Sequence, residues 1–320
     1  MESIRKLLAL LAVTAMVFTG CSGTAESSGT SQENTASSAA LETTETYPLT
    51  VDFLKVGKAD AAVISTENHV IVIDCGETTD GKKIRNCLNY LGRDTVDYMI
   101  LTHYDQDHIG GAAKVINEFT VNRVFAADYD EPSNEFSALT EAMSAKSLSF
   151  DLITSVYTFS VDDVYFEVYP CQQQSYHDGN DNNHSLVIKM THHDEVFLFT
   201  GDAMQERLTE LMDIGDCDVL KEPYHGREVA NLGDFLDKVT PEYAVVTTDE
   251  ENYADATAQA LADRNIETYV TFRDGNIRCT STGSSVSFET GLNFKEEDTG
   301  SEDSAGADAE SSAEETNETV

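Results

Sequence analysis

Strand-like and helix-like segments alternate along most of this chain, and this alternation restricts the possible folds more than any other sequence feature. The β-branched run Val70–Ile73 and the segment 98–101 have the length and composition of buried strands. Segment 82–91 is predicted to be helical, and segment 109–119 has the apolar spacing of a helix packed on a sheet. Residues 276–288 are instead typical of a closing hairpin. Strands that alternate with helices and also form hairpins predict mixed sheets layered with helices.

Polar residues follow directly after several of the predicted strands. Asp74 comes after the strand 70–73, His103 after 98–101 and Asp202 after 196–199. Open α/β sheets bind their ligands beyond the carboxyl ends of the strands. We therefore expect the ligand site of this chain at that edge of the fold.

The densest polar segment runs from 101 to 111 and reads Leu-Thr-His-Tyr-Asp-Gln-Asp-His-Ile-Gly-Gly. Imidazole and carboxylate groups suit zinc or manganese, and the lack of thiolates disfavours a structural zinc site. An acidic surface turn with helix-capping residues would explain Asp105 or Asp107 alone, but it does not explain the flanking His103 and His108. The segment therefore predicts a metal site where a strand ends and a helix begins.

This segment resembles the signature of the metallo-β-lactamase superfamily, in the variant in which Asp replaces the second His. Four other segments resemble motifs of the family in the same order, namely 53–61, 72–76, 198–202 and 220–226. The first, Phe-Leu-Lys-Val-Gly-Lys-Ala-Asp-Ala, is similar to the extracellular domain of the ComEC competence family and its stand-alone relatives. The resemblance implies an α/β fold, the metallo-β-lactamase αββα sandwich of two mixed sheets with outer helices.

The resemblance also implies two divalent metal ions, zinc or manganese, and their ligands. His103 and Asp105 would bind one ion, Asp107, His108 and His225 the other, and Asp202 would bridge both. Asp74 would orient a ligand without binding metal. The further His of the family is missing before the strand 185–190, where Asp181 or His184 could complete the first site, although an Asn-rich turn alone explains the segment.

Two metals about 3.5 to 4 Å apart acidify a bridging water and clamp the scissile group, so the resemblance implies a hydrolase that uses a dinuclear metal-bound hydroxide. Asp107 would be the catalytic residue, because it would accept a hydrogen bond from this hydroxide as well as bind metal. The ComEC resemblance favours a phosphodiester as the substrate. A formal net charge of −38 disfavours long nucleic acid as a partner, so we expect a small or short phosphodiester or a related ester.

The alternative from another class is a lipid-anchored metal-binding or envelope-interaction protein that has the same fold and little turnover. Hydrolysis of β-lactams is a weaker possibility, because the variant with Asp in place of the second His is associated with other substrates. Metal content together with hydrolysis of a chromogenic phosphodiester would distinguish an enzyme from a binding protein.

The two ends of the chain have compositions that differ from the part between them. Residues 1–21 combine Arg5 and Lys6 with an apolar run and Thr-Gly-Cys21, the pattern of a lipoprotein signal peptide. We expect 22–46 to be a disordered Ser/Thr/Glu tether, 47–292 the metallo-β-lactamase-fold domain, and 293–320 an acidic disordered tail. The mature protein would then be extracytoplasmic, monomeric and lipid-anchored to the bacterial cell membrane.

The remaining histidines and cysteines are assigned to the scaffold. The five cysteines after Cys21 are scattered and show no CxxC spacing, so we expect small buried residues and no thiolate metal site. His192 and His193 fall at a predicted hairpin tip, where an exposed turn explains them. His69 and His177 are expected to be structural or solvated.

The lipid anchor gives a first prediction. Cys21→Ala removes the thiol to which a lipid would be attached, so we expect the variant to leave the membrane fraction or to remain unprocessed. Membrane fractionation and electrophoretic mobility measure the two effects. A variant that fractionates and migrates like the wild type would show that Cys21 carries no anchor.

Overall fold

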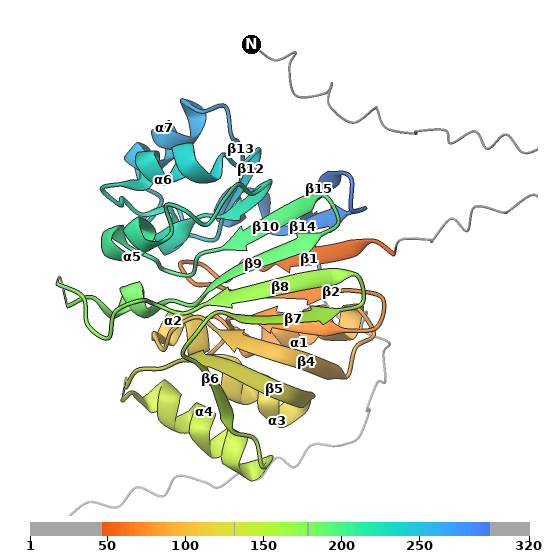
Figure 1. Cartoon of the computed structure of the whole chain (residues 1–320). Helices are drawn as coiled ribbons and strands as arrows, with labels where there is room; N and C mark the ends of the chain where they lie inside the picture. The colour runs from red at the N-terminus through yellow and green to blue at the C-terminus, as the bar shows by residue number, and fades with distance from the viewer. Residues whose placement is uncertain (1–46, 131, 178, 295–320) are drawn as a thin grey trace, which may run out of the picture. The chain divides into compact units, whose positions relative to one another are not determined.

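The computed structural model describes residues 47–130, 132–177 and 179–294, which form two facing β-sheets with helices on their outer faces (Figure 1). The predicted signal peptide, the tether and the acidic tail beyond Phe294 lie outside the described residues. Within the described part of the chain, no helix has the length and the apolar character needed to cross a membrane.

The first sheet has eight strands in the order β15-β14-β1-β2-β3-β4-β5-β6. Strands β3 to β6 run parallel, whereas β2, β1, β14 and β15 pair antiparallel. The strands are β1 (Leu49–Phe53), β2 (Ala62–Ser65), β3 (Val70–Ile73), β4 (Thr95–Leu101), β5 (Thr120–Ala127), β6 (Phe150–Ile153), β14 (Asn276–Ser281) and β15 (Val286–Leu292).

The second sheet has seven strands in the order β13-β12-β11-β10-β9-β8-β7. Strands β10 to β13 run parallel and β7 to β10 antiparallel, so this sheet is mixed as well. The strands are β7 (Tyr157–Val161), β8 (Val164–Tyr169), β9 (Val187–His192), β10 (Glu195–Phe199), β11 (Val219–Lys221), β12 (Tyr243–Val246) and β13 (Glu267–Val270).

Helices cover the outer face of each sheet. Apolar residues of α1, α3 and α4 share a core with the first sheet, and those of α5, α6 and α7 share one with the second. The helices are α1 (Gly81–Tyr90), α2 (Gln106–Ile109), α3 (Ala112–Glu118), α4 (Asn134–Ala145), α5 (Gln205–Glu210), α6 (Leu232–Val239), α7 (Asp255–Ala262) and α8 (Thr271–Asp274). Two 3-10 turns, η1 (Asp181–His184) and η2 (Pro223–Gly226), complete the elements.

The sequence of β3 shows why each sheet is covered on both faces. Its four residues, Val-Ile-Val-Ile, are all buried. Val70 and Val72 join the core beneath the helices, while Ile71 and Ile73 join the core between the two sheets. Successive side chains of a strand point to opposite faces, so a strand that is apolar at every position needs a cover on each side. The predicted αββα sandwich is confirmed.

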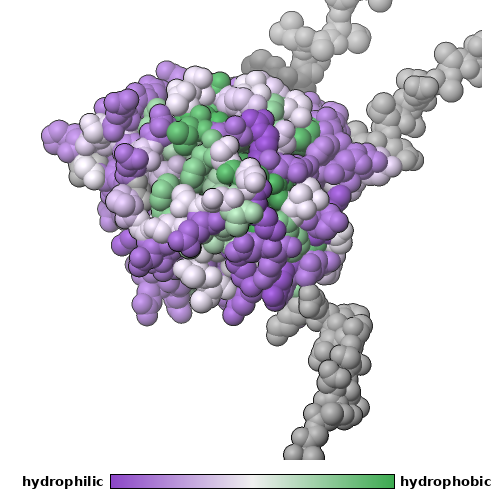
Figure 2. All heavy atoms as spheres, turned by 90° about the horizontal axis from the view of Figure 1, so that it is seen from below, coloured by the Kyte–Doolittle hydropathy of each residue, from purple (hydrophilic) through white to green (hydrophobic). Residues whose placement is uncertain are grey.

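One edge of the first sheet is formed by β6, which has only four residues. Leu152 is 48% exposed and Val156, just after the strand, is 51% exposed. Asp151 pairs with Arg123 at 2.9 Å beside them. Figure 2 shows the molecule from below, the side of α4 and β6 in Figure 1, with apolar surface between hydrophilic side chains. A short strand that carries a paired charge is a poor template for edge-to-edge association.

The structure departs from the sequence-based expectation at the helix predicted over 109–119. This helix is divided into α2 and α3 at Gly110 and Gly111. The amide of Gly111 donates to the carbonyl of Gly76, and Gly111 packs directly against backbone around Cys75 and Gly81. The close approach of these backbone segments, which only a residue without Cβ permits, is the physical reason for the division.

Helix α4 and strands β6 and β7 were not predicted from the sequence. In α4 only Leu139, Ala142 and Met143 are buried, so its apolar face is narrow. The available signal was its N-terminus, where the hydroxyl of Ser133 accepts the amide of Phe136. In β6 and β7 the buried and exposed positions do not alternate strictly, which weakens the strand pattern.

The close packing at Gly111 gives a second prediction. A Cβ there would lie 2.3 Å from the carbonyl oxygen of Cys75 and 2.7 Å from the amide nitrogen of Gly81. Because backbone atoms cannot rotate aside, Gly111→Ala should lower the free energy of unfolding by about 1–3 kcal/mol. Thermal denaturation of the metal-free protein measures the loss.

Gly233→Ala is the matched control for this substitution. Gly233 lies in α6, and a Cβ there meets only the far end of the Arg264 side chain, at 3.1 Å. Because alanine favours helix over glycine by about 1 kcal/mol, this variant should be as stable as the wild type or more stable. Equal melting temperatures for the two variants would contradict the close packing at Gly111.

Candidate metal centre

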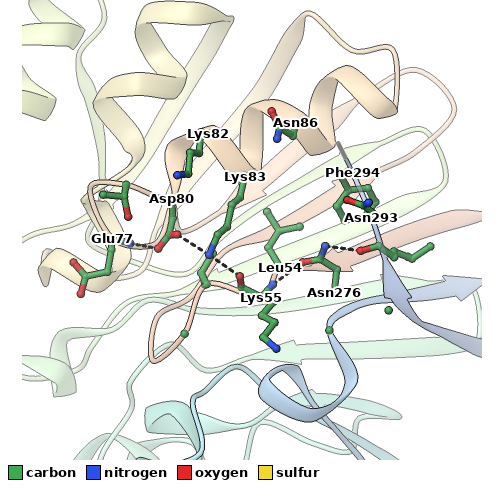
Figure 3. Close-up of a pocket in the computed structure, with 16 residues that line it drawn as sticks. Leu54, Lys55, Glu77, Asp80, Lys82, Lys83, Asn86, Asn276, Asn293 and Phe294 are labelled. Carbon is green, nitrogen blue, oxygen red and sulfur yellow. Dashed lines mark hydrogen bonds and ion pairs between the residues drawn. The ribbon is translucent and has the colours of Figure 1, made fainter. Parts of the chain in front are cut away.

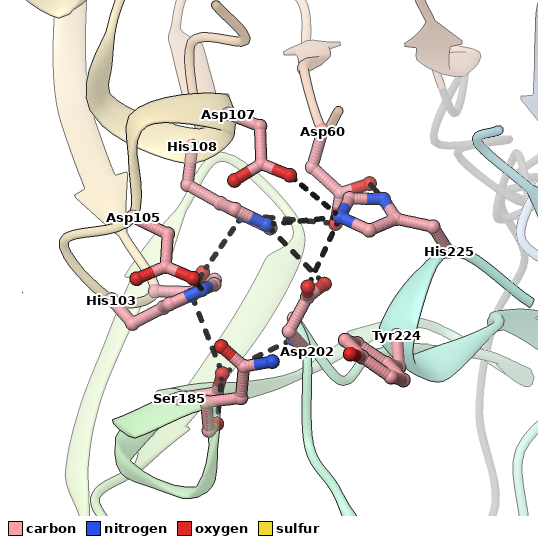
Figure 4. A network of polar contacts seen from close by, with 12 residues as sticks. Asp60, His103, Asp105, Asp107, His108, Ser185, Asp202, Tyr224 and His225 are labelled. Atoms are coloured by element: carbon pink, nitrogen blue, oxygen red, sulfur yellow. Dashed lines mark hydrogen bonds and ion pairs between the residues drawn. The ribbon is translucent and has the colours of Figure 1, made fainter. Parts of the chain in front are cut away.

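The predicted ligands come from both sheets and meet where the strands end (Figure 4). His103 and Asp105 follow β4, and Asp107 and His108 lie in α2. Asp202 follows β10 and His225 lies in η2 after β11. His225 and the preceding Tyr224 both have left-handed backbone, with φ of 52° and 50°. This uncommon conformation in two consecutive non-glycine residues turns the imidazole back toward the other sheet.

Four of the side chains converge closely. The Nε2 atom of His225 lies 3.0 Å from Asp202 Oδ2 and 3.3 Å from Asp107 Oδ2. The Nε2 atom of His108 lies 3.3 Å from Asp202 Oδ1 and 3.3 Å from the Nε2 atom of His225. All four residues are buried. Two imidazole nitrogens at this distance and two carboxylates around them need a proton or a metal cation in their midst.

His103 and Asp105 lie beside this group. The Nε2 atom of His103 is 3.6 Å from Asp105 Oδ2, and the ring centroid is 4.0 Å from that of His108. His103 is fully buried, and its Nε2 atom makes no hydrogen bond; the same holds for the Oδ1 atom of Asp202. An unsatisfied buried polar atom costs about 1–3 kcal/mol, so both atoms fit the place of metal ligands.

Asp74 fixes His108 from behind. Its Oδ1 atom accepts the amide of Thr102 at 2.8 Å, and its Oδ2 atom accepts the hydroxyl of Thr102 at 2.7 Å. The same Oδ2 atom is 2.8 Å from the Nδ1 atom of His108. The Nε2 atom of His108 is thereby left to face Asp202. A carboxylate behind the imidazole is the usual support of a metal-binding histidine, which agrees with the orienting role expected for Asp74.

Asp60 lies behind His225 as Asp74 lies behind His108, and it was not predicted as a site residue from the sequence. Its Oδ1 atom is 3.2 Å from the Nδ1 atom of His225 and accepts the hydroxyl of Thr247, and its Oδ2 atom accepts the ammonium of Lys221. Asp60, His108, Asp202 and His225 are close enough together to hold an ion. Asp60 faces the Nδ1 atoms of the two rings, whereas Asp202 faces their Nε2 atoms. Asp60 therefore orients the rings rather than completing the group around Nε2.

Negative charge dominates the electrostatics of this cluster. Burial alone would lower the pKa of His225, but the charges of Asp202 and Asp60 raise it to about 10. Burial likewise opposes the charged form of Asp202, yet the charges of His225 and His108 hold its pKa well below the usual range. The cluster contains two lysines, Lys58 and Lys221, and five carboxylates, those of Asp60, Asp74, Asp105, Asp107 and Asp202. Such an excess of buried negative charge favours bound cations.

The segment before β9, where a further ligand was considered, turns His184 elsewhere. His184 Nδ1 is 3.2 Å from the carbonyl oxygen of Asp181, Nε2 is 3.3 Å from that of Gln174, and the ring stacks on Tyr129 at 4.5 Å. Ser185 is the residue of this segment that approaches the cluster. Its hydroxyl accepts the amide of Asp202 at 3.1 Å and is 3.4 Å from the Nδ1 atom of His103. The segment thus acts as a turn, η1, that supports the cluster through Ser185.

A cavity of about 760 Å³ lies on the loop between β1 and β2 (Figure 3). None of the six predicted ligands lines it. Lys83 crosses it to the carbonyl of Lys55 at 2.8 Å and to Asp80 at 2.9 Å, and the Lys55 amide donates to Asn276 at 2.7 Å. These polar groups form hydrogen bonds and an ion pair with one another. The cavity and the metal cluster are connected through the loop between β1 and β2.

The cysteines play no part in the cluster. Cys75, Cys87, Cys217 and Cys279 are buried and Cys171 is partly exposed, and within the described ranges all five are free thiols. Burial raises the pKa of the Cys75 thiol well above its usual value, which keeps it in the unreactive form. The expectation of small buried residues is confirmed for all but Cys171.

Comparison with known families agrees with this arrangement. Residues 54–248 match the family model described as the metallo-beta-lactamase superfamily, and the chain belongs to this superfamily. The matched range includes all six predicted ligands together with Asp60 and Asp74.

Two curated relatives are bacterial proteins. ComE operon protein 3 of Bacillus subtilis (strain 168) is 24% identical over 225 residues, which cover 63% of this chain and 28% of the relative. Recombination protein 2 of Haemophilus influenzae (strain ATCC 51907 / DSM 11121 / KW20 / Rd) is 25% identical over 212 residues, 63% of this chain and 24% of the relative. The chain thus spans about a quarter of their length. The predicted resemblance to the ComEC group is confirmed.

A solved structure shares the fold at low identity. The metallo-beta-lactamase fold protein YhfI from Bacillus subtilis superimposes with a TM-score of 0.50 and 11% identity, over 70% of this chain and 96% of that one. This likeness shows the sandwich alone.

The contacts of Asp60 give a third prediction. Asp60→Asn keeps the size of the side chain but removes the charge that faces His225 and His108, so we expect metal affinity to fall by ~10–100-fold without loss of stoichiometry. Competition with a chromophoric chelator measures the affinity. His184→Ala is the control and should bind metal like the wild type, because His184 turns away from the cluster. Wild-type affinity in Asp60→Asn would contradict the orienting role.

Proposed function

We propose that this chain is a metal-dependent hydrolase with two divalent ions, zinc or manganese. One observation carries the proposal: buried His and Asp side chains from both sheets converge, and two of their atoms, His103 Nε2 and Asp202 Oδ1, make no hydrogen bond. The proposed ligands are His103 and Asp105 for one ion, Asp107, His108 and His225 for the other, and Asp202 for both.

The chemistry of the ions would be hydrolytic. Two bound divalent ions would acidify a water and neutralise the charge that develops on a phosphoryl or carbonyl group. The chain's own residues would hold and orient these ions. Asp74 and Asp60 keep the rings of His108 and His225 turned toward Asp202, and burial keeps bulk water away from the ligands. Asp107, with 9% of its side chain exposed, would accept a hydrogen bond from the reacting water.

Two cationic side chains near the cluster support a phosphodiester as the substrate. Lys58 Nζ is 2.6 Å from Asp107 Oδ2, and 32% of the Lys58 side chain is exposed. Arg227 lies over the ring of Tyr224 at 4.8 Å and donates to its hydroxyl at 3.0 Å. One ammonium and one guanidinium beside a metal site suit a single phosphate group. The acidic chain opposes binding of a long polyanion, so a small or short phosphodiester, or a related ester, fits better than nucleic acid.

The place of the reaction belongs to the same proposal. The signal-peptide pattern before Cys21 supports an extracytoplasmic, lipid-anchored protein, which would meet its substrate at the cell envelope. The tether 22–46 would give the domain reach from the membrane.

Substitution of the ligands tests the hydrolase. His225→Ala should remove the ion at the site with more ligands and lower hydrolysis of a chromogenic phosphodiester by more than the ~100-fold expected of a merely supporting residue. Asp202→Ala should reduce occupancy of both ions, because it removes the proposed bridge. Metal counting by mass spectrometry and the rate of hydrolysis are the two measurements.

His177→Ala is the matched control, because His177 is exposed and belongs to no part of the cluster. It should keep the wild-type number of metals and full turnover. Full activity with the wild-type number of metals in His225→Ala would end the assignment. Two tightly bound metals without turnover in the wild type would instead support the alternative, a lipid-anchored metal-binding or envelope-interaction protein.

A further inference from the structure

A second group of metal-ligating side chains lies at the opposite end of the second sheet. Asp163 comes from the turn between β7 and β8, His192 is the last residue of β9, and His193 lies in the turn between β9 and β10. Their ligand atoms all lie within 4.8 Å of one another. Strand β10 begins next to this group and ends just before Asp202, so the two sites are roughly 20 Å apart along one strand. We propose that Asp163, His192 and His193 bind one divalent ion of the zinc class, separate from the candidate catalytic centre.

His192 is the strongest part of this inference. An exposed turn was expected to explain it, and this expectation is wrong, because His192 is fully buried. Its Nδ1 atom is 2.8 Å from the hydroxyl of Ser281, but its Nε2 atom makes no hydrogen bond. That free Nε2 atom faces Asp163 Oδ2 at 3.5 Å. An imidazole with one nitrogen fixed by a hydrogen bond and the other free within a group of ligands is the usual arrangement of a metal-binding histidine.

The spacing of the three ligand atoms fits a small cation. Tetrahedral zinc with bonds of about 2.0–2.1 Å places neighbouring ligand atoms about 3.3 Å apart. Asp163 Oδ2 is 2.9 Å from His193 Nε2 and 3.5 Å from His192 Nε2, values on either side of that distance. An ion pair between Asp163 and His193 explains the first contact without a metal. It leaves the buried Nε2 atom of His192 unsatisfied, which a shared ion would not.

The backbone brings the two histidines to the same side. Successive side chains of a strand point to opposite faces, yet the ring centroids of His192 and His193 are only 5.0 Å apart. The chain reverses at His193, which has a left-handed φ of 55°. Gly283, in the turn between β14 and β15, leaves room for the ring, because a Cβ there would lie 2.5 Å from His193 Cδ2. Three hairpin turns therefore shape this group.

The chemistry of the donors selects the class of ion. A neutral imidazole offers a lone pair to a metal, and the Nε2 atom of His192 makes no hydrogen bond that would occupy it. Two imidazoles and one carboxylate suit zinc and its neighbours among the transition metals, with water in a fourth position. The ion would connect the turns of β7–β8 and β9–β10, and through Ser281 also the first sheet. Its effect would be to stabilise the end of the sandwich remote from catalysis.

Zinc titration of the metal-stripped, full-length protein tests the inference. Wild type should bind one more zinc per chain than Asp163→Asn or His193→Gln. Zinc should also raise its melting temperature by roughly 5–10 °C more than theirs, as expected when a ligand is present at about 100 times its dissociation constant. The Asp163 and His193 side chains are 37% and 43% exposed, so neither substitution disturbs the core. Hydrolysis by these variants should equal that of the wild type.

Asp194→Asn is the matched control, since Asp194 is an exposed carboxylate in the same turn and lies outside the group. It should bind zinc like the wild type. The inference is overturned if Asp163→Asn and His193→Gln keep both the wild-type zinc stoichiometry and the wild-type rise in melting temperature. His225→Ala should retain this zinc, so a failure of the catalytic assignment and a failure at the hairpin turns give different results.

Discussion

The buried negative charge between the two sheets is the constraint on which the other features of the site depend. Asp107, Asp202 and Asp60 are withdrawn from water, and charged groups in a protein interior are tolerated only when partners offset the loss of hydration. Lys221 and the Nδ1 atoms of the histidines offset part of it. The negative charge that these partners do not offset faces the Nε2 atoms of the rings, where protons or metal cations can offset it. Uncompensated negative charge is therefore concentrated at this one place in the fold.

The sandwich is what allows side chains so distant in sequence to share that point. His108 belongs to the first sheet's layer and His225 to the second's, and their Nε2 atoms are 3.3 Å apart. The core between the sheets holds this distance, because both inner faces are apolar and fully buried. Close packing transmits small displacements, so the close approach of Gly111 to the backbone of Cys75 also helps to place α2 and thereby His108.

Much of this could be predicted from the sequence, since the β-branched runs and the His-x-Asp-x-Asp-His segment carry strong local signals. Strand β3 (Val70–Ile73) begins and ends at the expected residues, and helix α1 (Gly81–Tyr90) begins and ends one residue before the predicted segment 82–91. The environment of Asp60 and of His192 could not be predicted. Each depends on partners far away in the chain, Thr247 for Asp60 and Ser281 for His192. A pattern of neighbouring residues contains no information on such contacts, and His192 was therefore assigned to an exposed turn.

The two proposed ions of the catalytic centre differ in their support from the protein. Asp107, His108, His225 and Asp202 would hold one of them, whereas His103, Asp105 and Asp202 would hold the other. Ser185 stands next to His103 and contributes only a hydroxyl that accepts the amide of Asp202. A neutral hydroxyl is a weak ligand compared with an imidazole, so His103, Asp105 and Asp202 would hold an ion with fewer protein ligands. An ion held by these residues would supply polarisation of the scissile group.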